Sequence, residues 1–170
     1  MFTPFEPDHS NDVNDPNDVN DPNGSNDPND PNDPNDLRGR IDTIEEAYEF
    51  MLAYAAQGVS GDAGSQSGGQ VREFLTRAAG ALTGLGDLYL SLVERERLEP
   101  ARYRPFGAVL DRDARDSLAA VDLVLAQPAI SSQIVDNLNA SIHLRALLTD
   151  LFLIDEVLKS RLKPAPTYEK

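Results

Sequence analysis

The stretch "VREFLTRAAGALTGLGDLYLSL", residues 71–92, decides the fold of this chain. Its apolar residues recur at alternating intervals of four and three positions, and they are Val71, Leu75, Ala78, Leu82, Leu85, Tyr89 and Leu92. This heptad spacing places them along one side of an α-helix, as in coiled coils and helical bundles. The sequence therefore predicts one long helix over about residues 70–98, whose apolar side packs against other helices.

Three glycines, Gly80, Gly84 and Gly86, interrupt this predicted helix. Each costs a helix about 1 kcal/mol relative to alanine, so their presence needs a reason. Either another helix approaches closely at the glycines, or the helix kinks there. We expect the close approach, because the heptad spacing keeps its phase through all three positions.

Three further segments have the apolar spacing of a helix. The first covers about residues 43–57, where Thr43 and Glu46 have the spacing of a capping box. The second begins near residue 105 or 113 and ends near residue 126, before a proline. The third covers about residues 131–162 and carries apolar residues around most of its circumference, so we expect it to be the most buried of the four.

These four segments predict the fold class, since no segment shows the alternation of a β-strand. We expect an all-α protein, an antiparallel (up-down) four-helix bundle over residues 38–163 in which the first helix is the shortest. An acidic, disordered N-terminal arm of residues 1–37 precedes the bundle, and a short disordered tail of residues 164–170 follows it.

The arm carries most of the negative charge of the protein. Residues 1–37 contain ten acidic and no basic residues, whereas the whole chain has a net charge of −14. Asn-Asp-Pro triplets recur from residue 14 to residue 34, and these residues favour turns and extended backbone over helix. We expect the arm to act as a solubilising spacer or as an electrostatic contact for a basic partner protein.

The composition argues against several classes of function. The negative charge disfavours nucleic acids and anionic membranes as partners. The chain has no cysteine, which rules out disulfides and thiolate chemistry. The first residues lack the basic start and apolar run of a secretory signal, and no stretch has the length of a membrane span. We therefore expect a cytoplasmic protein without a cofactor.

Three sets of residues are candidate sites. The heptad side offers an interaction face, made of Leu75, Leu82, Leu85, Tyr89 and Leu92. Arginine side chains can grip a carboxylate or phosphate, which makes a predicted loop an anion site, made of Arg102, Tyr103 and Arg104. One stripe of the last helix could hold a metal together with a carboxylate from a facing helix, and its residues are Asp136, His143 and Asp150.

The sequence shows no catalytic arrangement of nucleophile, base and acid. Our first expectation is a non-enzymatic interaction module or adaptor, a helical bundle that binds a protein partner or a second copy of itself. The alternative is a regulatory bundle that binds a metal or ligand at the stripe of His143 or between Arg102 and Arg104. The two hypotheses differ in whether the stripe is buried beside a carboxylate of another helix.

Overall fold

The structure is a computed structural model that describes residues 36–63 and 66–162. The predicted tail and all of the predicted arm except residues 36 and 37 therefore lie outside the described residues. Every regular element within these two ranges is an α-helix, which confirms the all-α prediction. The helices are α1 (Leu37–Ala55), α2 (Gln66–Leu82), α3 (Leu85–Arg95), α4 (Pro100–Leu125), α5 (Ser132–Asn139) and α6 (Ile142–Leu162).

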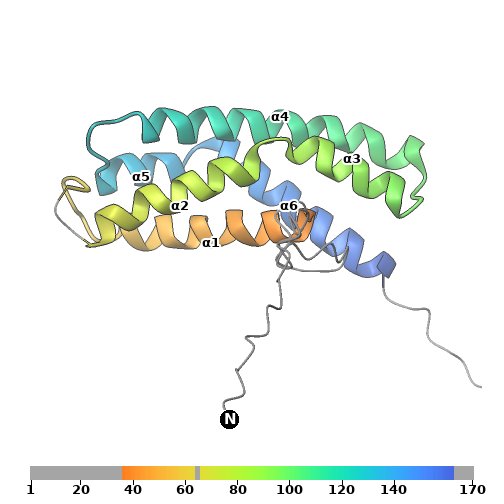
Figure 1. Ribbon diagram of the computed structural model, residues 1–170, viewed down its shortest axis with the longest axis horizontal. Coiled ribbons are helices and arrows are strands. Elements are labelled where there is room, and N and C mark those ends of the chain that lie inside the picture. The colour runs from red at the N-terminus through yellow and green to blue at the C-terminus, as the bar shows by residue number, and fades with distance from the viewer. Residues whose placement is uncertain (1–35, 64–65, 163–170) are drawn as a thin grey trace, which may run out of the picture.

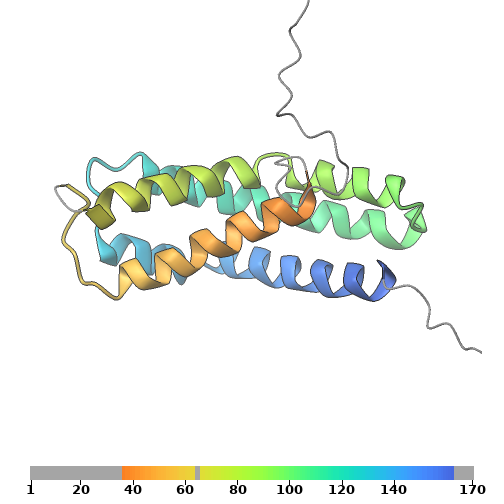
Figure 2. The ribbon, with the colours of Figure 1, turned by 60° about the horizontal axis from the view of Figure 1, so that its bottom comes forward.

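The helices lie side by side (Figures 1 and 2). They enclose one apolar core. Helix α1 lies against α2 and α5, whereas α4 lies against α2, α3 and α6. The largest fully buried side chains come from all of these helices or the loops between them, and they include Tyr54, Met51, Leu75, Leu85, Leu110, Ile130, Leu147 and Leu151. The periodic apolar residues of the sequence therefore form the interior.

The single helix predicted over residues 70–98 is two helices, α2 and α3. The chain breaks at Gly84, which has a φ of 70°, a left-handed conformation that favours glycine. At Gly86 another helix approaches closely, because an added Cβ atom would lie only 2.9 Å from the Cα atom of Asp111 on α4. Both explanations of the glycines thus hold, at different positions, and nothing lies within 4 Å of a Cβ atom added at Gly80.

The helix predicted over residues 131–162 is also two helices, α5 and α6. The chain leaves the helical path at Ala140 and Ser141, and the carbonyl oxygen of Ser141 accepts a 3.2 Å hydrogen bond from the backbone N–H of Arg145. Asparagine and serine side chains favour turns and helix ends, and Asn139 and Ser141 flank this break. The Asn-Ala-Ser sequence therefore marks the break, which the apolar spacing does not.

Two predicted helix starts were also wrong. Helix α1 begins at Leu37, six residues before Thr43, so the predicted capping box does not form. The hydroxyl of Thr43 instead donates a 2.8 Å hydrogen bond to the carbonyl oxygen of Gly39 within the helix. Helix α4 begins at Pro100, because proline has the φ of the first helical turn and needs no hydrogen-bond acceptor there.

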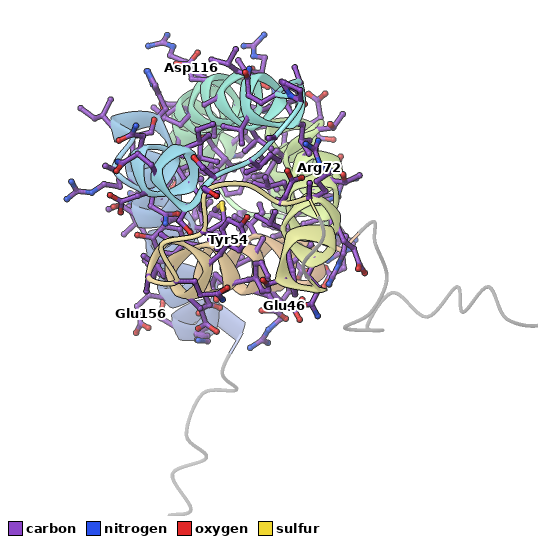
Figure 3. The ribbon with its side chains drawn as sticks, turned by 90° about the vertical axis from the view of Figure 1, so that its left-hand side faces the viewer. Glu46, Tyr54, Arg72, Asp116 and Glu156 are labelled. Carbon is purple, nitrogen blue, oxygen red and sulfur yellow. The ribbon has the colours of Figure 1, made fainter. Side chains whose placement is uncertain are left out.

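A network of buried polar contacts joins the α1–α2 loop to the α4–α5 loop at one end of the molecule. The hydroxyl of Tyr54 donates to the carbonyl oxygen of Ile130 at 2.8 Å, and the hydroxyl of Ser132 donates to the carbonyl oxygen of Tyr54 at 2.7 Å. Asp62 accepts a 2.8 Å hydrogen bond from the backbone N–H of Ile130 and forms an ion pair with Arg72. Figure 3 looks at this end and shows Tyr54 pointing inward between the helices.

Arg72 and Asp62 connect three segments in this loop network. The guanidinium of Arg72 also donates to the carbonyl oxygens of Leu125 at 3.1 Å and Gln127 at 2.8 Å, at the end of α4. Burial alone would raise the pKa of Asp62, but the hydrogen bonds from Ile130 and Arg72 outweigh it and lower the pKa below the ordinary value. Asp62 is therefore held as a carboxylate, and the network is a structural element.

Candidate functional site

The heptad residues offered as an interaction face are not on the surface. Leu75 and Leu85 have no exposed surface, and Leu92, the most exposed of the set, is 8% exposed. Leu82 and Tyr89 are buried as well. The spacing that predicted a docking side is used to pack α2 and α3 against the rest of the protein, so a partner would have to bind elsewhere.

The predicted anion site lies at the start of α4 and not in a loop. Arg102 forms an ion pair with Glu99 at 2.7 Å, and Arg104 forms one with Glu94 at 2.9 Å. Tyr103 is half-buried, and its backbone carbonyl oxygen lies 3.4 Å from the Tyr89 hydroxyl. Both guanidiniums therefore already face carboxylates of the same protein.

The predicted metal stripe is divided by the break between α5 and α6. Asp136 lies on α5 and lines a shallow hollow beside the α1–α2 loop, whereas His143 and Asp150 lie on α6. The Nδ1 atom of His143 is 3.7 Å from a carboxylate oxygen of Asp116 on α4, and both side chains are about half exposed. Within residues 36–63 and 66–162, no group of three or more His, Cys, Asp or Glu residues could hold a metal ion.

Asp150 has a different neighbour, the carboxyl group of Asp113 on α4. Burial, followed by the contact with Asp113, raises the pKa of Asp150 to about 6. Its Oδ2 atom is buried and has no hydrogen-bond donor among the described residues. Protonation of one of the two carboxyl groups would supply such a donor, so the contact between α4 and α6 is more favourable when the pair holds a proton.

The most unusual surface belongs to α6. Ile142, Phe152 and Leu153 are 75%, 58% and 52% exposed, although α6 also contributes Leu147 and Leu151 to the core. The prediction that this segment would be the most buried was therefore wrong. Its apolar residues surround the helix, but the other helices cover only part of its circumference. We call the exposed side, with Ile142, Phe152 and Leu153, the α6 surface.

A groove with three aromatic side chains borders the α6 surface on one side. Its volume is about 190 Å³, and α3, α4 and α6 supply its lining, which consists of Tyr89, Arg102, Tyr103, Phe106, Leu153, Ile154, Val157 and Leu158. The Tyr89 and Phe106 rings meet edge to face, with centroids 6.1 Å apart. Arg102 is the one charged residue in this lining, so the aromatic groove is an apolar slot with a cation at its rim.

A second groove lies on the opposite side of the α6 surface, toward α1. Its volume is about 540 Å³, and its lining consists of Tyr48, Ala140, Ile142, Arg145, Ala146, Leu148, Thr149 and Phe152. Phe152 and Leu153 are adjacent in the chain but line different grooves. They form an apolar ridge between the two grooves, and a binding partner could contact the ridge and place side chains in both grooves.

The aromatic groove exists because α1 begins too late to cover it. In both ribbon views, α3, the start of α4 and the end of α6 continue past the first residue of α1 (Figures 1 and 2). Glu45, two turns into α1, is close to the end of α6, since its pKa is raised by burial and is also affected by Asp155 and Lys159. The open groove therefore lies toward the end of the molecule that α3, α4 and α6 form beyond the start of α1.

Comparison with known proteins adds no relative. No protein-family model, no curated protein and no solved structure matches this chain. Among the helices of the described ranges, none is both long and apolar enough to cross a membrane.

Proposed function

We propose that this protein is a non-enzymatic interaction module whose α6 surface binds a protein partner. The observation that supports it is the exposure of Ile142, Phe152 and Leu153 on a helix that otherwise belongs to the core. Soluble proteins expose single apolar residues often, but a ridge of large apolar side chains between two grooves is typical of a binding surface.

The partner that fits this surface is an amphipathic helix. Its apolar side would lie on the ridge of Phe152 and Leu153 and place one side chain in the aromatic groove. An acidic residue beside that anchor would face Arg102 at the rim. In this proposal the six helices act as an antiparallel four-helix bundle, in which α2 continues into α3 and α5 into α6. The partner then extends the packing that the short α1 leaves incomplete.

The matched pair Leu153→Glu and Leu123→Glu tests this function. Both leucines are exposed, at 52% and 67%, but Leu123 lies on α4 and lines neither groove. The tagged full-length variants are used to recover host proteins, which quantitative mass spectrometry identifies. We expect a specific partner to be held by the wild type and by Leu123→Glu and to be lost from Leu153→Glu. Equal recovery by all three proteins, or by none, contradicts the proposal.

Thermal unfolding of both variants is the necessary companion measurement. An exposed Leu→Glu change alters the free energy of unfolding little, within about 0.5 kcal/mol. If Leu153→Glu loses the partner but unfolds at the same temperature as the wild type, the loss results from the changed α6 surface and not from unfolding. The arm remains the proposed spacer or contact for a basic region of the partner, because its acidic residues are concentrated ahead of α1.

A further inference from the structure

We propose that the protein's own residues 2–5, with Phe2 and Phe5, occupy the aromatic groove until a partner displaces them. The proposal rests on the proposed function only for this last, regulatory step. The occupancy itself is argued from the groove, the sequence ahead of α1 and the place where that sequence is attached.

The groove has the size and chemistry for aromatic side chains. Its volume of about 190 Å³ is below that of sites for drug-sized ligands, which begin near 300 Å³, so it suits one or two side chains. Tyr89, Tyr103 and Phe106 line one side of it, and edge-to-face packing of aromatic rings adds about 1 kcal/mol to their burial.

Only one part of residues 1–36 matches this chemistry. Phe2 and Phe5 are the two aromatic residues in that range, and the sequence after them consists almost entirely of Asn, Asp, Pro and other small or polar residues. Val13 and Val19 are the remaining branched apolar residues there, and they stand alone between acidic triplets. Glu6 directly follows Phe5, which places a carboxylate within reach of Arg102 when Phe5 is in the groove.

The connection has the necessary reach. The 31 residues between Phe5 and Leu37, as a flexible chain, would span about 30 Å on average. Helix α4, with 26 residues, is about 39 Å long, and Glu45, two turns into α1, lies near Asp155 of α6, one turn from Leu158. Tethering at this distance gives an effective concentration of about millimolar, so even a weak contact is populated.

Charge favours the same arrangement. The side chains of Arg102 and Glu99, which form an ion pair, are 73% and 60% exposed. Ion pairs between exposed side chains contribute little to the free energy of unfolding. Arg102 can therefore exchange Glu99 for Glu6 at small cost. The ten acidic residues ahead of α1 would also hold a basic partner near the groove, and that partner's binding would draw the arm away.

The absence of cysteine makes a direct test possible in the full-length chain. Thr3→Cys introduces a single thiol between the two phenylalanines, which accepts a nitroxide spin label. We expect the label to reduce the backbone amide signals of Tyr103, Leu153 and Val157 in the ¹⁵N spectrum, relative to the reduced label. The amide signals of Asp62 and Ile130, at the other end, should keep their intensity.

Two variants in the same background identify the anchors. Phe2→Ser with Phe5→Ser should abolish the signal loss, whereas Val13→Ser with Val19→Ser should leave it in place. Unaffected groove signals, or a loss that survives removal of both phenylalanines, overturn the proposal. A spin-labelled chain mixed with a ¹⁵N-labelled, cysteine-free chain tests for a second copy as the occupant, and signal loss in that mixture also overturns it.

These outcomes are separate from those of the proposed function. Partner recovery with Leu153→Glu and Leu123→Glu reports on the α6 surface whether or not residues 2–5 occupy the groove. The regulatory step has its own readout: the variant Phe2→Ser with Phe5→Ser should recover more of the partner than the wild type does. An unchanged recovery beside a confirmed occupancy would remove the regulatory step alone.

Discussion

At the scale of single residues, two partly or largely buried aspartates have opposite surroundings. Asp62 is surrounded by hydrogen-bond donors, the N–H of Ile130 and the guanidinium of Arg72, and these lower its pKa. Asp150 is covered by α4 and faces another carboxyl group, and both effects raise its pKa. The number of donors around each carboxyl group, more than its depth, decides which charge state the fold prefers.

Asp62→Asn removes the charge and keeps the size of the side chain. We expect the free energy of unfolding near neutral pH to fall by about 1–2 kcal/mol, because the 7% exposed carboxylate loses its charge-assisted contact with Arg72. The loss is no larger because the Arg72 side chain is 36% exposed, so solvent screens the contact. Since the folded pKa is lowered, the contribution of Asp62 is present above the ordinary aspartate pKa and is lost as the pH falls through the lowered value.

Urea unfolding of the wild type and Asp62→Asn at about pH 7 and about pH 3 measures both effects. The difference between the two proteins should shrink in acid. Asp116→Asn is the control, because Asp116 is 48% exposed and its contact with His143 contributes at most about 0.5 kcal/mol. A control variant that loses as much stability as Asp62→Asn would contradict the assigned role.

Asp150→Asn should have the opposite effect. The folded pKa of Asp150 is raised to about 6, so its favourable contribution is complete below the ordinary value and is lost as the pH rises through about 6. The neutral amide imitates the protonated carboxyl group, and we expect a gain of about 1 kcal/mol at pH above 7, reduced from the full shift because the side chain is partly exposed.

The gain of Asp150→Asn should disappear as the pH falls toward about 4, since the wild type then becomes protonated as well. Urea unfolding across this pH range provides the measurement. The exposed Asp122 on α4 supplies the control variant Asp122→Asn, which should show no such pH-dependent gain. A gain that is independent of pH would mean that the proton shared with Asp113 is not its cause.

At the scale of the helices, glycines set how closely α3 and α4 approach. Gly107 on α4 faces Leu90 on α3, where an added Cβ atom would lie 2.7 Å from a methyl carbon. Gly86 on α3 faces the backbone of α4 at Asp111, which cannot move aside as a side chain can. The close packing of α3 against α4 therefore requires glycine at both Gly86 and Gly107.

Gly86→Ala and Gly80→Ala form a matched pair on the predicted long helix. Gly86→Ala should lower the free energy of unfolding by about 2 kcal/mol or more, because the new methyl group overlaps the Asp111 backbone. Gly80→Ala should raise it by up to about 1 kcal/mol, since alanine favours the helix and nothing lies within 4 Å. Thermal unfolding followed by circular dichroism measures both, and effects of equal sign would contradict the helix packing described here.

Sequence patterns predicted the helical class because burial follows the helical period, and Leu75 and Leu85 are buried as the heptad spacing requires. Apolar spacing did not locate the helix breaks at Gly84 and Ser141. The helical spacing of apolar residues continues without interruption past Gly84 and with little interruption past Ser141. The candidate surface was missed for a third reason. Leu153 lines the groove that α1 begins too late to cover, and a periodicity within α6 contains no information about another helix.

At the scale of the whole molecule, the two ends differ. One end is tied by the loop network, in which the Asp62 side chain bonds the backbone of Ile130, 68 positions away. At the opposite end, α3, α4 and α6 have no α1 beside them (Figures 1 and 2). The lining of the aromatic groove comes from these three helices. A segment can therefore enter at the open end without disturbing the contacts that fix the closed one.

The loop network also has a consequence for the rate of folding. The most extensive helix pairs, α1 with α2 and α3 with α4, join neighbours in the chain, and such local hairpins form early because little loop entropy is lost. The contact of Asp62 with Ile130 closes a much longer loop, so it should form after the transition state. Asp62→Asn should then speed unfolding about tenfold and leave the folding rate nearly unchanged, as stopped-flow measurements in urea would show.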